Sequence, residues 1–470
     1  MHGGGSDPLT HVKSLVSGRP LVRPLVAALS AFALAGMSGN GCSTTSTPAG
    51  GNGDDGGQIA PPTGGDDGST TAPVAEASTD DGNATVGDGS TDDGSVDGDT
   101  TGDSGEGGGA CVAALYGSYV VRWDGKLLEE TVTGLSGSET TVLNASSGSP
   151  LGPVLNVQDG AAHGCAAIAG NADASGSGSA WCWRTATNGN ASGQLGSGTT
   201  DTDGPLFHGT QVLTAANQPL TNVASVADGA GNTACAVTGE GKLYCWGDVT
   251  WLVYNGNGGT TVPAAYAVPI TTDGTTPLTN VLQAAVHFTF ACALVSGPSS
   301  NEVWCWGFNN GNVQNLGVGD NVNHQYPTRV VGPSNPTAIS IADFNGLYGS
   351  TCVVDGANVR CWGETSAVGN VSSNGTSPAL VELQDGTTPL GTVVDLKRGI
   401  NDFCTLNSDS TVWCWGATYK GYASQYAATN VTLLGQAGGL GGSGAGPSFL
   451  TNDGVYHIGS GTRMLSCGPL

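Results

Sequence analysis

Short runs of apolar and β-branched residues, separated by Gly, Asn and Asp, recur along the C-terminal part of the sequence. One unit has a run at residues 219–229, a second at 234–237 and a third at 241–247. Runs of this length and punctuation are typical of β-strands joined by turns. Because residues alternate between the two faces of a strand, the cysteine of the third run lies on one face and its aromatic neighbours on the other. We expect the aromatic face to pack against a neighbouring sheet.

Five such units each contain a cysteine, a polar gap and a second cysteine that is followed by tryptophan. The second cysteines recur at intervals of 63, 60, 56 and 53 residues, and a period near this length indicates a stacked or circular repeat architecture. A turn joins the two cysteine runs, so the two thiols can face each other across a hairpin, within disulfide reach. The predicted pairs are Cys165 with Cys182, Cys235 with Cys245, Cys292 with Cys305, Cys352 with Cys361, and Cys404 with Cys414.

A further apolar run precedes each cysteine hairpin, and in four units it begins with a Pro-Leu pair. These pairs are Pro150-Leu151, Pro219-Leu220, Pro277-Leu278 and Pro389-Leu390, with Pro336-Thr337 as a weaker version. Together with the hairpin and the segment after Trp-Gly, this run gives each unit about four short strands. Four strands are the content of one blade of a β-propeller.

A glycine-rich element after the first complete hairpin, Gly193-Gln194-Leu195-Gly196, has a degraded copy at residues 311–320. Hairpin and element together resemble the repeat of the regulator of chromosome condensation family, whose bacterial members carry Cys-Trp-Gly followed by Gly-Gln-Leu-Gly. The resemblance covers about residues 111–470 and implies an all-β fold, a seven-bladed β-propeller. Five blades are plain in the sequence. Two more are predicted at the ends: Cys111–Leu115 with Tyr119–Trp123 as a hairpin that has lost its second cysteine, and residues 448–459 as one that has lost both.

Two segments precede the predicted propeller. Residues 1–42 contain Lys13, Arg19 and Arg23 followed by an apolar run too short for a transmembrane helix, which predicts a secretory signal. Cys42 after this run fits the lipid-attachment cysteine of a bacterial lipoprotein, although Gly39 replaces the usual leucine of that motif; cleavage after Ala35 with plain secretion is the alternative. Residues 43–110 contain 14 acidic residues and no Lys or Arg, which predicts a disordered linker.

The cysteine count fits an exported protein. Thirteen cysteines leave three outside the five hairpins: Cys42 for the lipid, and Cys111 and Cys467, which would close the ring as a disulfide between its two ends. Zinc is the rival use of the hairpin cysteines. Separations of 9 to 17 residues favour disulfides, because structural zinc sites use closely spaced pairs.

Charge and motifs narrow the function. Residues 111–470 carry 10 basic and 23 acidic residues, which argues against a nucleic-acid partner. No metal-ligand spacing and no nucleophile motif occurs, so we expect no cofactor, no metal site and no enzymatic activity. His163 and His287 precede first hairpin cysteines, where related propellers often carry a histidine, and we assign them to packing.

We therefore predict a non-enzymatic binding module of the cell envelope that presents its loops to a protein or glycan and is held to the membrane by a lipid anchor. The family resemblance implies protein partners. The guanine nucleotide exchange and β-lactamase inhibition of two relatives do not carry over, because export excludes a cytosolic GTPase and no inhibitory loop is recognisable. A polysaccharide lyase or hydrolase, or a structural surface lipoprotein, are the alternatives. Within residues 417–447, Tyr419, Tyr422 and Tyr426 form the preferred contact surface.

Overall fold

A computed structural model describes residues 112–464. Gaps in the described residues fall at 117–118, 123–125, 132–137, 161, 171–177, 229–230, 251, 253–263, 310–313, 344–347, 371, 400–401, 418–420, 427–429, 435–448, 452–454 and 459–460. The chain divides into two compact units: Met1–Met37 with Gly107–Leu470, and Ser38–Glu106. All described residues belong to the first unit. The predicted signal (1–42) and linker (43–110) lie outside the described residues.

The described strands form seven antiparallel sheets of four or five strands, which we number blades 1 to 7 in chain order. Blade 1 has β1 (Val112–Tyr116), β2 (Tyr119–Arg122), β3 (Leu127–Thr131) and β4 (Ser138–Thr141). Blade 2 has β6 (Val154–Asp159), β7 (His163–Ile168), β8 (Ser179–Arg184) and β9 (His208–Gln211), and the short β5 (Leu143–Asn144) joins β9 in parallel. Blade 3 has β12 (Val223–Asp228), β13 (Thr233–Thr238), β14 (Leu243–Gly247) and β15 (Ala264–Pro269). A two-stranded sheet of β10 (Leu213–Ala215) and β11 (Gln218–Pro219) lies between blades 2 and 3 in the chain.

Blades 4 to 7 repeat this order. Blade 4 has β16 (Val281–Val286), β17 (Phe290–Ser296), β18 (Asn301–Gly307) and β19 (His324–Arg329). Blade 5 has β20 (Pro336–Asp343), β21 (Gly349–Asp355), β22 (Asn358–Gly363) and β23 (Ala379–Leu380), with the 3₁₀ turn η1 (Thr365–Ala367) before β23. Blade 6 has β24 (Val393–Arg398), β25 (Asp402–Asn407), β26 (Val412–Gly416) and β27 (Ser424–Gln425). Blade 7 has β28 (Val431–Leu434), β29 (Phe449–Thr451), β30 (Val455–Ile458) and β31 (Gly461–Met464).

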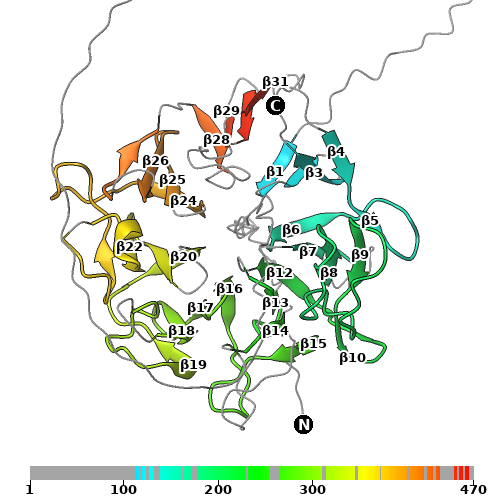
Figure 1. The fold of residues 1–470 in the computed structure, drawn as a ribbon. Coiled ribbons are helices and arrows are strands. Elements are labelled where there is room, and N and C mark those ends of the chain that lie inside the picture. The colour runs from blue at the N-terminus through cyan, green and yellow to red at the C-terminus, as the bar shows by residue number, and fades with distance from the viewer. Residues whose placement is uncertain are drawn as a thin grey trace, which may run out of the picture. The chain divides into compact units, whose positions relative to one another are not determined.

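The sheets are arranged as a propeller (Figure 1). The first strand of each blade, here the inner strand, contacts the inner strands of the blades before and after it, and β1 contacts β28, which closes the ring. Each blade is a meander, so all inner strands begin at the same end of the ring, which we call the lower end. The turns between second and third strands also lie at this lower end. The predicted propeller fold is confirmed.

Disulfides and tryptophans hold neighbouring blades together. All five predicted hairpin disulfides are present, in blades 2 to 6. Each one is buried in the cluster that forms against the next blade, and four of them lie with the next tryptophan: Trp246, Trp306, Trp362 and Trp415. The aromatic face of each third strand therefore packs on the preceding blade, as the alternation predicts. Five disulfides indicate an oxidising environment.

The Gly-Gln-Leu-Gly element fastens blade 2 to blade 3. Trp246 Nε1 donates a 2.8 Å hydrogen bond to the Gln194 carbonyl oxygen, and Leu195 is buried in the same cluster. Gly196 has φ +61°, and a Cβ there would lie 3.0 Å from the Trp246 ring, so only glycine lets the loop approach this closely. Leu316 of the degraded copy is buried with Trp362 of blade 5. The element that carries the family resemblance is thus a structural clip.

The terminal hairpins differ from each other. The last is where the sequence predicts it, because β29 and β30 are the second and third strands of blade 7. The prediction for the hairpin of blade 1 is wrong by one strand. The cysteine hairpins consist of the second and third strands of a blade, whereas β1 and β2 are the first and second strands. Short apolar runs joined by a tight turn look alike in every hairpin of a meander, and only the contact of β1 with β6 and β28 identifies it as the inner strand. Within the described residues, no helix has the length and apolar character needed to cross a membrane.

Candidate binding site

The lower ends of the inner strands all carry the same irregularity. In every blade the ladder to the second strand skips one residue near the beginning of the inner strand, which is a β-bulge. The skipped residues of blades 2 to 7 are Leu155, Ala224, Leu282, Thr337, Val394 and Thr432. All six are exposed, and the three large apolar side chains among them, Leu155, Leu282 and Val394, are 42%, 51% and 56% exposed. The bulges therefore turn apolar side chains out of the blades at one end of the ring.

A hollow of about 580 Å³ opens among these residues at blades 3 and 4. Its size falls within the roughly 300–1,000 Å³ typical of ligand pockets. Three successive bulge residues, Ala224, Leu282 and Thr337, line it together with Ser225 and the turn that ends at Gly241. Val237, Val281 and Leu294 add apolar wall. The hollow thus combines apolar walls with a few polar groups, as binding pockets do.

The turn Thr238–Gly241 is tied to the first residues of blade 4. Val281 N donates to the Gly241 carbonyl oxygen at 2.9 Å, and Gly241 has φ +74°. A Cβ at Gly241 would lie 2.9 Å from the backbone of Asn280, so a larger residue would push the two blades apart. This wall of the hollow is fixed by backbone contacts.

The rim of the hollow carries a charged pair. Glu240 forms an exposed 2.8 Å salt bridge with Lys242. The hydrogen bond and the charge of the Lys242 ammonium lower the pKa of Glu240 below its ordinary value. The carboxylate is therefore ionised at neutral pH, beside a lysine that a ligand can displace at little cost because exposed pairs are weak.

Side-chain amides close two other junctions between blades at the inner strands. Asn156 of blade 2 donates from Nδ2 to the Val226 carbonyl oxygen at 2.8 Å and accepts from Val226 N at 2.9 Å. Gln283 of blade 4 accepts from Ile339 N of blade 5 at 2.9 Å. Ser225 occupies the same position in blade 3, two residues before the one that pairs with the first hairpin cysteine, and it lines the hollow. The hollow therefore lies at a junction where a serine stands in place of the bridging amide.

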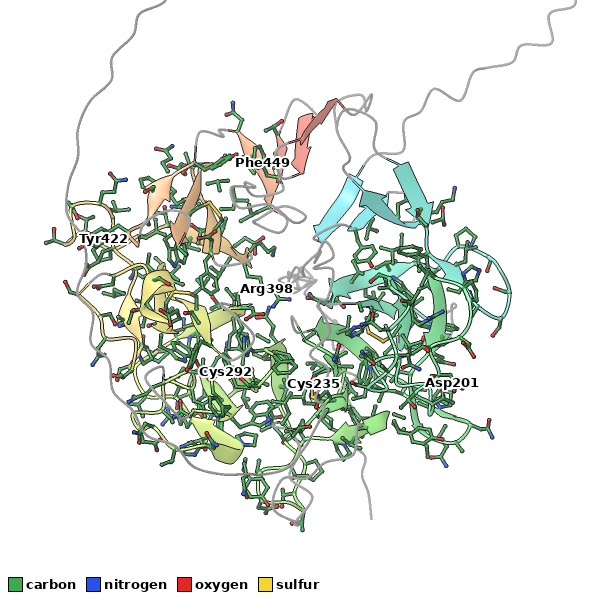
Figure 2. The ribbon with its side chains drawn as sticks, in the orientation of Figure 1. Asp201, Cys235, Cys292, Arg398, Tyr422 and Phe449 are labelled. Atoms are coloured by element: carbon green, nitrogen blue, oxygen red, sulfur yellow. A yellow bond between two sulfur atoms is a disulfide. The ribbon has the colours of Figure 1, made fainter. Side chains whose placement is uncertain are left out.

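The predicted tyrosine surface is only partly described. Tyr419 lies outside the described residues. Tyr426 is half-buried and packs edge-on against Phe449 of blade 7, with ring centroids 5.9 Å apart, so it contributes to the blade 6–7 junction. Tyr422 is also half-buried and lies at the outer margin of the ring (Figure 2). A smaller hollow of about 390 Å³ beside it includes Asp385, whose pKa is lowered to about 2 by hydrogen bonds from Thr388 and Thr387.

The remaining predicted cysteines, Cys42, Cys111 and Cys467, also lie outside the described residues. The ten hairpin cysteines are all fully buried and act in blade packing. Among the described residues, no group of three or more His, Cys, Asp or Glu side chains is close enough together to hold a metal ion.

Histidines and buried charges connect inner strands near their upper ends. His287 is buried, and its Nε2 lies 3.1 Å from Asp343 Oδ1 of blade 5, while His163 is buried in blade 2. Arg398, which Figure 2 shows near the middle of the ring, donates to the Ile341 carbonyl oxygen at 3.2 Å. These contacts join blade 4 to blade 5 and blade 6 to blade 5, so the groups hold the ring together.

Sequence reasoning missed the bulge residues and the hollow. A bulge is a property of pairing between two strands, and nothing in a run such as Val281-Leu282-Gln283 marks Leu282 as the unpaired residue. The sequence does contain one sign of the site. The third residue of the inner strand is an amide in blades 2 and 4, Asn156 and Gln283, but is Ser225 in blade 3.

Comparison with known proteins finds similarity of fold only. No protein-family model matches the chain, and no curated protein sequence matches it. Human WBSCR16 is 15% identical, with 67% of this chain and 79% of that chain covered and a TM-score of 0.48. Prp20p from Saccharomyces cerevisiae, the yeast RCC1 protein studied with its binding to Gsp1p and histones, is 14% identical over 68% of this chain and 78% of that chain, with a TM-score of 0.44. The ectodomain of the Arabidopsis thaliana receptor kinase ACR4 is 15% identical over 67% of this chain and 81% of that one, with a TM-score of 0.33.

These solved structures include the yeast member of the family that the repeat resembles. At such identities and TM-scores, the propeller assignment depends on the sheet topology of this chain itself. The class of protein that fold and site define is a disulfide-stapled β-propeller with a hollow at the lower end of its inner strands.

Proposed function

We propose that the chain is an exported, non-enzymatic binding module that holds a protein partner at the lower end of blades 3 and 4. The observation that carries this proposal is the hollow of about 580 Å³, open beside the exposed Leu282 on a scaffold with a disulfide in each of five blades. Rigid scaffolds that present irregular backbone at one end are common recognition surfaces. An apolar side chain that a bulge turns outward would form the anchor of the contact.

Export and attachment are part of the same proposal. The buried disulfides are stable in an oxidising compartment, which supports a place outside the cytoplasm. We propose that Cys42 carries the lipid, that residues 43–110 serve as tether, and that Cys111 pairs with Cys467. A non-reducing peptide map of protein from native membranes tests all three: it should show a lipid mass on Cys42 and the Cys111–Cys467 peptide. An unmodified Cys42 would leave a secreted protein, and a free Cys111 would remove the clasp.

Position-specific photo-crosslinking tests the binding site. A benzophenone amino acid replaces Leu282 in the full chain, expressed in its native envelope, and replaces Leu206 in a matched control. Leu206 is also an exposed leucine but lies before β9 of blade 2, away from the hollow. We expect one discrete protein adduct from position 282 and none from position 206. Equal adducts from both positions would contradict the site.

The alternatives predict other results. A polysaccharide lyase or hydrolase would turn over envelope glycans, and a glycan-binding module would retain them without turnover. A structural lipoprotein would give no discrete adduct at either position. If the tyrosine segment is the contact surface, a photo-crosslinker at Tyr422 would give the adduct instead.

A further inference from the structure

The inner strand of each blade has one hydrogen-bonding edge that does not pair within the blade. At Val226 this edge is filled, because both the N–H and the carbonyl oxygen bond to the Asn156 carboxamide of blade 2. Val226 pairs in the ladder with Ala236, one residue before the pair of Ala227 with Cys235. At this ladder position, the backbone groups thus point away from the second strand and toward the preceding blade.

Ala284 occupies the same ladder position in blade 4. It pairs with Ala293, one residue before the pair of Ala285 with Cys292. Ile339 has this position in blade 5, and its N–H donates to Gln283 of blade 4. By the same geometry, the N–H and carbonyl oxygen of Ala284 point toward blade 3, where Ser225 stands in place of Asn156 and Gln283.

The backbone of Ala284 has no side-chain hydrogen-bond partner among the residues that the structure describes. The Ser225 side chain is shorter than a carboxamide side chain and does not form the bridge that Asn156 forms to Val226. Ala284 is nevertheless buried. Buried backbone polar groups in proteins are almost always paired, so this edge favours a ligand that brings a donor and an acceptor together.

The walls of the hollow indicate what else the ligand carries. Ser225 faces it, and Leu282 and Gln283, which directly precede Ala284, line it as well. Val237, Val281 and Leu294 offer apolar contact, while Glu240 gives the rim a carboxylate. An extended peptide meets these conditions, since it presents side chains of different chemistry at regular intervals.

We propose that the hollow takes an extended peptide segment of a partner protein and that an asparagine or glutamine carboxamide of this peptide pairs with Ala284 as Asn156 pairs with Val226. An aliphatic neighbour of that residue packs on Leu282, and a lysine or arginine reaches Glu240. This inference rests on the proposed function, because it names the group by which the module recognises its protein partner.

The first test needs no ligand. In the full-length protein, amide hydrogen exchange at Ala284 should be at least about tenfold faster than at Val226 and Ile339, whose N–H groups are bonded. The variant Ser225→Gln places a carboxamide where Gln283 stands in blade 4 and should slow exchange at Ala284 to the rate at Ile339. Ser225→Ala should leave it fast. Exchange at Ala284 as slow as at Val226 in the unaltered protein would overturn the open edge.

The second test uses a defined peptide. The probe is an acetylated, amidated Lys-Val-Leu-Gln-Ala-Val-Lys peptide, whose central residues copy the segment that presents Gln283, and the matched control has methionine in place of its glutamine. The readout is the amide signal of Ala284 in the ¹⁵N-alanine-labelled full chain. We expect the glutamine peptide to shift this signal in the unaltered protein and in Ser225→Ala but not in Ser225→Gln, and the methionine peptide to bind about tenfold more weakly. Equal binding of the two peptides, or no shift with either, would overturn the carboxamide assignment.

Failure of this inference is distinguishable from failure of the proposed function. If the protein captured at position 282 crosslinks to Ser225→Gln as well as to Ser225→Ala, the binding module stands and the carboxamide contact is wrong. If no protein is captured at all, the proposed function is wrong, and the exchange and peptide measurements still decide whether the edge is open. If an N-acetylglucosamine oligosaccharide shifts the Ala284 signal and the peptide does not, the ligand is a glycan and the peptide proposal is wrong.

Discussion

The junction between blades 2 and 3 and the junction between blades 3 and 4 are built alike at their outer parts and differently at their inner ends. In both, a buried disulfide packs with the tryptophan of the next blade, and that tryptophan donates to a loop carbonyl oxygen of the preceding blade: Trp246 to Gln194 and Trp306 to Leu252. At the inner ends, Asn156 bridges the first junction, whereas Ser225 at the second lines a hollow. The outer contacts are thus sufficient to hold neighbouring blades, and the inner end is available for binding.

Removal of an outer contact should have the largest effect. The double variant Cys235→Ala with Cys245→Ala removes a cross-link that restricts the unfolded chain, and it leaves a gap beside Trp306 in the folded protein. We therefore expect the free energy of unfolding to fall by about 2–4 kcal/mol. Denaturant unfolding followed by tryptophan fluorescence measures it. The matched control, Cys352→Ala with Cys361→Ala, removes the corresponding disulfide of blade 5 and should cost a similar amount. A loss below about 0.5 kcal/mol in both would show that the disulfides do not hold the blades.

Opening the closed junction should have an intermediate effect. Asn156→Ala leaves the buried N–H and carbonyl oxygen of Val226 without partners, which should lower the free energy of unfolding by about 2 kcal/mol. Ser225→Ala is the control at the same position of the next blade and should change it by less than about 0.5 kcal/mol. The comparison fails if the two alanine variants unfold at the same denaturant concentration.

Closing the open junction should have the smallest effect and the opposite sign. Ser225→Gln supplies the missing bridge to Ala284 and should raise the free energy of unfolding by about 0.5–1 kcal/mol, the net contribution of a typical hydrogen bond. The shift of the unfolding midpoint in denaturant measures it. If Ser225→Gln lowers the free energy of unfolding, the 2–3 and 3–4 junctions differ in backbone spacing and not merely in this side chain.

The sequence alone predicts much of the fold because the information is local. Cys235 and Cys245 are joined by a tight turn, so strand alternation is enough to pair them and to place Trp246 on the opposite face. The order of four strands in a blade follows from the same short-range pattern. Even so, the sequence predicts the wrong strands for the first hairpin, since β1 and β2 contain none of the cysteines that give the register in blades 2 to 6.

Only the tertiary structure decided the binding site. Asn156 and Val226 are 70 residues apart in the chain and meet only when two blades pack, so no local pattern predicts their hydrogen bonds. The position of each bulge is set by pairing between strands, which turns Leu282 outward although its sequence is that of any buried strand. Spacing along the chain determined the blades and their disulfides, because both depend on neighbours in sequence. Packing between blades determined the hollow, because its walls come from the strands and the turn of different blades.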